Sequence, residues 1–329
     1  MSSTPPPTRP DSSSEAHARL AHGLPAASAD PSGSRNEARW GGRARIWFEA
    51  MRPRTLPAAV VPVVVGLAVA ARARRLDAGL AAATMGAALL IQIGTNLAND
   101  YFDFVAGADT AERLGPRRIT QAGLATPQAV RTAALVVLAL SALVGIYLVA
   151  AGGWPIAIIG MLSLVAAVAY TGGPWPIASH GMGDLFVFLF FGVVAVSGTV
   201  FLQTGTLSRL ALAASVPVGC LATAILVVNN LRDIPTDTRA GKRTLAVRIG
   251  ERATRVEYVA LLAATFLAVP LLALDAGAWS LIALGALPLA LREARALQPR
   301  SGASLNASLG ATARLHLVFG LLLALGLVL

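Results

Sequence analysis

Two clusters of asparagine and aspartate, each beside a long apolar stretch, carry the residue types and spacing that could do chemistry. The first cluster contains Asn96, Asn99, Asp100, Asp103 and Asp109. Asn99 and Asp103 are four positions apart and Asn96 precedes Asn99 by three, so a helix would place all three on one face. Asp100 would lie at the edge of that face, and Asp109 could fold back from the following loop.

The second cluster contains Asn229, Asn230, Asp233 and Asp237, and its two carboxylates are again four positions apart. Pro235 lies between them, and a proline removes a backbone donor and tends to kink or end a helix. The pattern therefore leaves open whether the pair straddles a helix end.

Oxygen ligands of this kind suit Mg²⁺, which proteins commonly hold through carboxylates together with substrate phosphates. Two such clusters facing each other across a cavity would hold Mg²⁺ ions around a diphosphate and stabilise it as it departs. The alternative is that these residues only cap helices and solvate loops. Matching clusters favour the metal site, because a carboxylate at membrane depth costs about 2.5–3.5 kcal/mol.

Basic residues follow each cluster: Arg117 and Arg118 the first, Lys242 and Arg243 the second. Guanidinium and ammonium groups both bind phosphate oxygens. Ordinary positive charge in cytoplasmic loops is the competing explanation. Lys242 and Arg118 are the preferred phosphate contacts.

Two further residues are candidates for substrate contact. Tyr170 closes a predicted helix, where its hydroxyl could bond a diphosphate or an aromatic substrate, or simply belong to the interfacial aromatic belt. His180 lies in a short loop without Lys or Arg, and could contact substrate or be polar surface. The sole cysteine, Cys220, excludes an intrachain disulfide and argues against a cysteine metal site.

The elements that must position these residues are membrane helices. The chain of 329 residues is 55% hydrophobic and 13% charged, whereas soluble domains average about 25% charged residues. Its apolar residues fall in runs of about 20, long enough to cross a bilayer. We expect an all-α membrane protein with nine spans, near residues 48–71, 78–104, 128–151, 154–171, 183–204, 208–231, 254–274, 278–297 and 309–329.

The basic residues predict the orientation. With the N-terminus in the cytoplasm, 23 of the 27 Lys and Arg residues lie on the cytoplasmic side and 4 lie outside, as the positive-inside rule requires. The net charge of +10 does not indicate nucleic-acid binding, because the basic residues lie between apolar runs. Residues 1–42 are predicted to be a disordered cytoplasmic tail, and residues 43–329 the transmembrane domain.

A weak internal repeat accompanies the clusters. One cluster follows the second predicted span and the other follows the sixth, so four helices separate them. This predicts two four-helix halves plus a ninth helix, arranged around a central cavity.

At these residues the sequence resembles the UbiA superfamily of membrane prenyltransferases. Asn99 and Asp103 match its first aspartate-rich motif with Asp109 as the last carboxylate, and Asp233 and Asp237 match its second. The gap from Asp103 to Asp109 is longer than the usual spacer, so Asp100 could share that role. The resemblance implies nine helices and Mg²⁺ held by Asn99, Asp100, Asp103, Asp109, Asp233 and Asp237.

Within the superfamily, looser segments resemble the enzymes that prenylate 1,4-dihydroxy-2-naphthoate in menaquinone synthesis: residues 52–57, 94–101, 115–118, 121–123, 170–174 and 180–181. The resemblance implies transfer of a polyprenyl group from polyprenyl diphosphate to that acceptor, with loss of CO₂, at the cytoplasmic face of a bacterial inner membrane. The implied catalytic residues are Asn99, Asp103, Asp233, Asp237 and Lys242. The implied substrate contacts are Asn96, Arg117, Arg118, Gln121, Tyr170, His180 and Arg243.

Three other functions remain open from the sequence. A related enzyme could use another aromatic acceptor such as 4-hydroxybenzoate. A cation-coupled transporter would also place carboxylates in spans, but near the bilayer midplane rather than at one face. A lipid-phosphate transferase using Mg²⁺ would be expected to carry an Asp-Gly-xx-Ala-Arg stretch, which is not conspicuous here.

Overall fold

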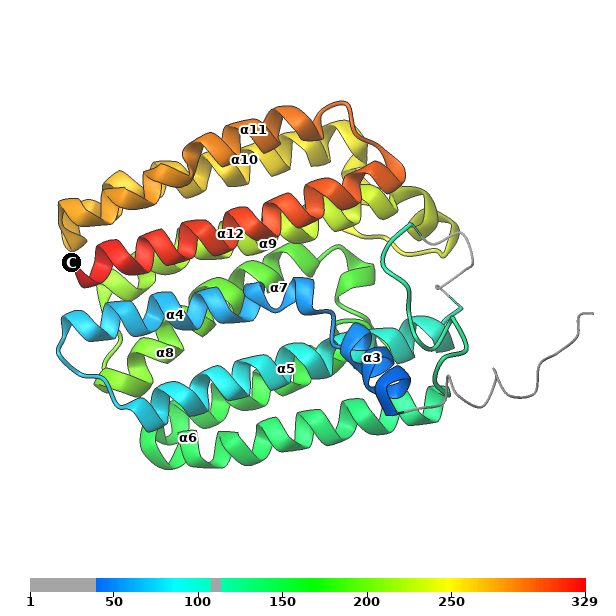
Figure 1. Cartoon of the computed structure of the whole chain (residues 1–329), viewed down its shortest axis with the longest axis horizontal. Helices are drawn as coiled ribbons and strands as arrows, with labels where there is room; N and C mark the ends of the chain where they lie inside the picture. Colours follow the sequence, from blue (N-terminus) through cyan, green and yellow to red (C-terminus); the bar gives the residue numbers. More distant parts are fainter. Residues whose placement is uncertain (1–39, 108–113) are drawn as a thin grey trace, which may run out of the picture. The chain divides into compact units, whose positions relative to one another are not determined.

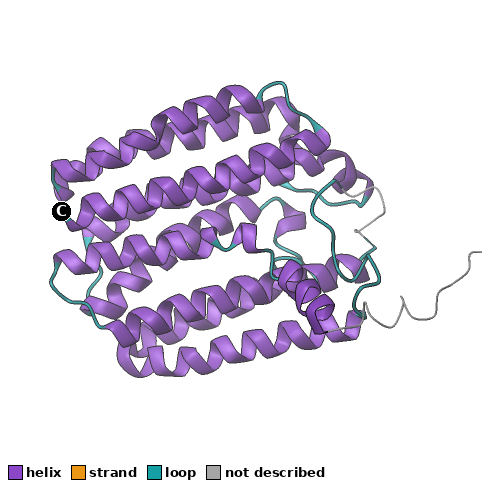
Figure 2. Cartoon of the chain, in the orientation of Figure 1, coloured by secondary structure: helices purple, strands orange, loops and turns teal. Residues whose placement is uncertain are grey.

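A computed structural model describes residues 40–107 and 114–329. The predicted tail therefore lies almost wholly outside the described residues. Asp109 lies outside them as well. The chain divides into two units, Met1–Arg45 and Ile46–Leu329, and apart from the helix Trp40–Ala50, which crosses their boundary, the description below concerns the second. The described residues form helices and loops without a strand (Figure 2), which confirms the all-helical class.

The helical elements follow one another along the chain (Figure 1) as α3 (Trp40–Ala50), η1 (Pro53–Thr55), α4 (Pro57–Arg72), α5 (Ala78–Val105), α6 (Pro127–Ala169), η2 (Ala178–His180), α7 (Gly183–Val187), η3 (Phe188–Val194), α8 (Ala195–Thr204), α9 (Arg209–Arg239), α10 (Leu245–Ala276), η4 (Ala278–Ala286), α11 (Leu287–Leu297), η5 (Gly302–Ser304) and α12 (Leu305–Val328).

Side-chain caps begin several of the long helices. The Asp77 carboxylate accepts a hydrogen bond from the Leu80 backbone N–H at 2.8 Å at the start of α5. Thr126, Ser208 and Thr244 cap α6, α9 and α10 in the same way. Each cap satisfies a backbone donor that the first helical turn cannot pair.

Six helices within the described ranges are long and apolar enough to cross a membrane, or seven if the bent pair Ala44–Thr55 and Pro57–Arg72 forms one span. The predicted number of nine stays a prediction. Helix α6 contains 43 residues with a break at Gly153, whose φ is 70°. A straight helix of that length would extend about 65 Å, more than twice the bilayer core. Leu148 and Ile156, on either side of this break, belong to one apolar cluster.

Helix α9 is the most buried of these spans, with 72% of its apolar segment inside the protein, whereas the corresponding share is 22% for α5 and for α6. Its apolar side chains pack with those of α4, α10 and α12 in the largest core cluster. At one point α9 meets η3 closely, because a Cβ built on Gly192 would lie 2.7 Å from the Gly219 Cα. Small residues permit such close approach between membrane helices.

The long helices run alongside one another, so their ends gather into two groups (Figure 1). At one end the Arg72 guanidinium donates to the Leu327 carbonyl at 3.2 Å, and the Asp77 backbone N–H donates to the Gln203 side chain at 2.7 Å. At the other end Lys242 reaches Asp103. Both acidic clusters belong to this second end.

Candidate active site

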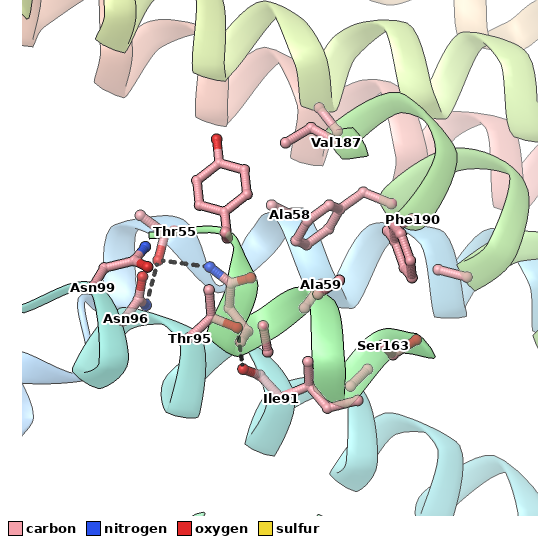
Figure 3. A pocket seen from close by; sticks show the side chains of 18 of the residues that line it. Thr55, Ala58, Ala59, Ile91, Thr95, Asn96, Asn99, Ser163, Val187 and Phe190 are labelled. Carbon is pink, nitrogen blue, oxygen red and sulfur yellow. Dashed lines mark hydrogen bonds between the residues drawn. The ribbon is translucent and has the colours of Figure 1, made fainter. Parts of the chain in front are cut away.

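Both acidic clusters open onto one cavity of about 1050 Å³. Its wall includes Asn99 and Asp103 from α5 and Asp233 and Asp237 from α9. Much of the remaining wall is apolar, from α6, η3 and α8. Figure 3 shows Asn99 on one side of this cavity and Phe190 across from it. A large apolar cavity with a few convergent polar groups is the usual form of a small-molecule site.

Asp103 is the electrostatic centre of the first cluster. Its buried carboxylate forms two ion pairs, one with the Arg118 Nη2 at 2.5 Å and one with the Lys242 Nζ at 2.7 Å. The two cations come from loops far apart in the sequence. Asp103 therefore brings the two predicted phosphate contacts together at the cavity.

Asp233, in the second cluster, is held by the neighbouring Arg232. The guanidinium donates from Nε to one carboxylate oxygen at 2.7 Å and from Nη2 to the other at 2.6 Å. Arg232 also donates to the Asn229 and Asn306 side-chain oxygens, each at 2.8 Å. Its side chain is 1% exposed. This bidentate geometry fixes the carboxylate in one orientation.

Helix α9 does not end at the second cluster. It continues through Pro235 to Arg239, so Asp233 and Asp237 lie one helical turn apart and both line the cavity. The possibility that a helix end separates the two carboxylates is thereby excluded.

Asn99 and Tyr170 complete the polar end of the cavity. The Asn99 side-chain oxygen accepts a hydrogen bond from the Thr171 hydroxyl, and its backbone carbonyl accepts one from Arg118. Tyr170 lines the cavity as well. Its phenol hydroxyl can donate a hydrogen bond to a substrate oxygen.

The donor set fits Mg²⁺ only together with a substrate. No three Asp, Glu, His or Cys side chains in the described part of the chain lie close enough to hold a metal by themselves. Asp103, Asp233, Asp237 and Asn99 nevertheless present oxygens to the same cavity. Mg²⁺ is commonly held by one or two carboxylates and completed by substrate phosphates, and this arrangement matches that mode.

A second group of polar side chains lies nearer the start of α5. Of this group, the sequence analysis predicted only Asn96. Thr55 of η1 accepts a hydrogen bond from the Asn96 side chain at 3.0 Å (Figure 3) and another from the Gln92 side chain at 3.3 Å. Gln92, Asn96, Asn99 and Asp103 follow the helical period, so one face of α5 lines the cavity from end to end.

Within the described part of the chain, four predicted site residues do not line the cavity. Asp100 was expected at the metal, but its carboxylate accepts hydrogen bonds from the backbone N–H groups of Ile119 and Thr120, at 3.1 and 3.3 Å. It thereby fixes the loop that carries Arg118. The metal role predicted for Asp100 stays a prediction, and the contact that the structure shows for it is with this loop.

The other three are Gln121, His180 and Arg243, none of which is among the cavity residues. The His180 ring stacks on Trp175 at 4.3 Å, and its Nδ1 lies 2.8 Å from the Pro176 carbonyl oxygen. The Arg243 backbone N–H donates to the Ser179 carbonyl at 3.0 Å. These contacts hold loops in place. Among the predicted residues, the cavity brings together Asn96, Asn99, Asp103, Arg117, Arg118, Tyr170, Asp233, Asp237 and Lys242.

Sequence reasoning missed several residues that shape the site: Thr55, Gln92, Thr171, Arg232 and Asn306. Gln92 could have been found, because it lies four positions before Asn96. Asn306 could not, because it comes from the last helix. There its side-chain amide donates to the Leu114 carbonyl at 2.8 Å, in addition to its bond with Arg232.

Residues 59–326 match the UbiA prenyltransferase family. The chain is 43% identical to the 1,4-dihydroxy-2-naphthoate octaprenyltransferase of Mycobacterium tuberculosis (strain ATCC 25618 / H37Rv), over 84% of this chain and 95% of that protein. It is 37% identical to the Escherichia coli (strain K12) protein of the same name, over 87% and 96%.

A solved structure is similar in fold. It is that of a UbiA homologue from Archaeoglobus fulgidus bound to GPP and Mg²⁺, with a TM-score of 0.63. The match covers 84% of this chain and 99% of that one, at 15% sequence identity. At that identity the likeness concerns the fold.

Proposed function

The chain belongs to the UbiA prenyltransferase family, and from this premise we propose that it transfers a polyprenyl group from polyprenyl diphosphate to 1,4-dihydroxy-2-naphthoate in a Mg²⁺-dependent reaction that releases CO₂. The immediate product would be demethylmenaquinol, the two-electron reduced form of demethylmenaquinone. The observation that carries the proposal is the convergence of Asp103, Asp233, Asp237, Arg118 and Lys242 on one cavity. The names of the two bacterial relatives support the acceptor.

The diphosphate would bind at the end of the cavity where the charges converge. Asn99, Asp103, Asp233 and Asp237 would hold Mg²⁺ together with the diphosphate oxygens, with Asp109 as a further ligand candidate outside the described residues. Mg²⁺ supplies Lewis-acid stabilisation of the negative charge that develops on the departing diphosphate. Lys242 and Arg118 are paired with Asp103, and both would also donate hydrogen bonds to the phosphate oxygens.

In the transfer step the allylic C–O bond breaks and its electron pair leaves with the diphosphate. The ring carbon that bears the carboxylate forms the new C–C bond. The electron pair of its bond to the carboxylate then returns to the ring as CO₂ departs, so the step needs no oxidant or reductant. The apolar wall, which includes Phe186 and Phe190, would exclude water from the allylic cation.

The acceptor assignment is tested by carboxyl-labelled 1,4-dihydroxy-2-naphthoate. We expect membranes that contain the protein, supplied with a polyprenyl diphosphate and Mg²⁺, to release the label as CO₂ in proportion to prenylated product. The alternative acceptor 4-hydroxybenzoate would keep its carboxylate. An active protein that retains the label in its product, or that prenylates only 4-hydroxybenzoate, contradicts the assignment.

The chain is a multi-pass membrane protein, and we place it in the bacterial cytoplasmic membrane with the N-terminus and the active site at the cytoplasmic face. Nine spans would satisfy this placement if α6 crosses twice and η4 with α11 crosses once. Residues 1–42 would form a cytoplasmic tail. The reason for this orientation is the excess of Lys and Arg at one set of helix ends. Family membership sets aside the transporter and the lipid-phosphate transferase.

Cysteine labelling tests the orientation. In a Cys220→Ala background, which removes the buried native thiol, Ala240→Cys should react with an impermeant maleimide only after the cells are opened. Leu207→Cys, exposed in the loop at the opposite helix ends, should react in intact cells. The reverse pattern would require the opposite orientation.

A further inference from the structure

Gln92 is a buried polar residue on the cavity wall with a carbonyl oxygen that has no hydrogen-bond partner among the described residues. The residue is 8% exposed. Buried side-chain oxygens are nearly always hydrogen-bonded, so an exception needs an explanation. On the wall of a substrate cavity the natural explanation is a ligand that donates a hydrogen bond.

The orientation of the Gln92 amide follows from the bonding of Thr55. The Thr55 hydroxyl donates its one proton to the Arg52 carbonyl at 2.9 Å. Its oxygen can then only accept, and it accepts from both Gln92 and Asn96. Gln92 must therefore turn its NH₂ group to Thr55 and leave its carbonyl oxygen for another partner.

Asn96 presents a second acceptor on the same face of α5. Its two amide protons are both used, one by the Met51 carbonyl at 3.0 Å and one by Thr55 at 3.0 Å. The side-chain carbonyl oxygen is the hydrogen-bonding atom that remains. Gln92 and Asn96 thus offer two carbonyl oxygens, one helical turn apart, along one strip of the cavity wall.

A pair of acceptors selects the chemistry of its ligand. Carbonyl oxygens repel diphosphate and carboxylate oxygens, which are acceptors themselves, and they bind hydroxyl groups, which donate. The polyprenyl chain is a hydrocarbon and has no hydroxyl group to donate. Of the two proposed substrates, only the ring hydroxyls of the aromatic acceptor meet this requirement.

We propose that the Gln92 side-chain carbonyl accepts a hydrogen bond from a ring hydroxyl of the aromatic acceptor and makes the enzyme selective for a dihydroxylated ring. This inference rests on the proposed function. It makes Gln92 a specificity-determining residue of the acceptor, separate from the groups that hold the diphosphate.

The spacing along α5 agrees with this role. Gln92 precedes Asp103 by eleven residues, which corresponds to about 16 Å along the helix. The diphosphate would lie beside Asp103, followed by the allylic carbon and then the ring. A hydroxyl on the far side of a bicyclic ring would be the group that comes nearest to Gln92.

Gln92→Met tests the proposal, because methionine has a similar length and no carbonyl oxygen. We expect kcat/KM for 1,4-dihydroxy-2-naphthoate to fall about 10–100-fold, the usual effect of removing a hydrogen bond to a buried substrate hydroxyl. The KM for geranylgeranyl diphosphate should not change. Gln298→Met, at the exposed end of α11, is the control and should behave as wild type.

Inhibition by two substrate analogues distinguishes a contact with the substrate from a purely structural role of Gln92. 1-Hydroxy-2-naphthoate and 4-hydroxy-2-naphthoate each lack one ring hydroxyl, and each is to be assayed as a competitive inhibitor of the wild-type enzyme. One of them should inhibit about tenfold more weakly than the other, and this difference should disappear in the Gln92→Met variant. Equal inhibition of the wild-type enzyme, or a difference that persists in the variant, overturns the proposal.

The outcomes also separate this inference from the proposed function. A wild-type enzyme that neither binds nor prenylates dihydroxynaphthoate contradicts the proposed function, and the inference falls with it. A wild-type enzyme that uses dihydroxynaphthoate, together with a folded Gln92→Met variant of unchanged acceptor kinetics, contradicts the role of Gln92 alone.

Discussion

Replacement of Asp103 by Asn is expected to lower prenyl transfer by about three orders of magnitude while the protein stays folded. Asparagine keeps the shape of the side chain and removes its charge. That charge pairs with Arg118 and Lys242 at 2.5 and 2.7 Å, and on the proposed function it also binds Mg²⁺. The loss of several kcal/mol of electrostatic stabilisation in the transition state corresponds to this change in rate.

The measurement is single-turnover transfer from a polyprenyl diphosphate at limiting and at saturating Mg²⁺. Asp77→Asn is a matched control on the same helix, because Asp77 caps α5 at its far end and asparagine is an equally good cap. The control should retain the wild-type rate. A folded Asp103→Asn variant with wild-type transfer at limiting Mg²⁺ would exclude the proposed metal site.

The second large effect concerns stability. Arg232→Met should destabilise the protein by about 3–5 kcal/mol, because it leaves the Asp233 carboxylate in a largely buried position without its cation. Asp233→Asn in the same chain removes the stranded charge. The double variant should therefore be more stable than Arg232→Met, and still inactive because the proposed metal ligand is gone.

Thermal unfolding in detergent and transfer activity, measured on the two single variants and the double variant, separate these effects. Arg209→Met is the control. It breaks the exposed pair with Asp275, in which the arginine side chain is 88% exposed, and such pairs contribute less than about 1 kcal/mol. If the double variant unfolds at or below the temperature of Arg232→Met, the ion pair is not the source of the instability.

Residues on one continuous helix were predictable from the sequence. Asn96, Asn99 and Asp103 follow the helical period, and the cavity brings all three together. The same rule places Asp100 at the edge of that face and leaves the direction of its side chain open. In the structure its carboxylate accepts hydrogen bonds from the backbone N–H groups of Ile119 and Thr120.

Contacts that depend on tertiary structure were beyond sequence reasoning. Asn306 comes from the last helix and contacts both Arg232 and Leu114, a meeting that no spacing predicts. Pro235 left the end of α9 open, since proline weakens a helix locally, whereas in the structure the helix continues to Arg239. The division of α6 depends on a single glycine, Gly153, at which the helix breaks.

The low burial of α5 and α6 has a consequence for enzyme kinetics. Only 22% of each apolar segment is buried inside the protein, so these cavity-forming helices keep much apolar surface that a bilayer would cover. On the proposed function, the polyprenyl diphosphate would reach the cavity by lateral diffusion in the bilayer. The concentration that matters is then its mole fraction among the lipids. Addition of inert lipid at constant bulk substrate should slow the reaction by surface dilution.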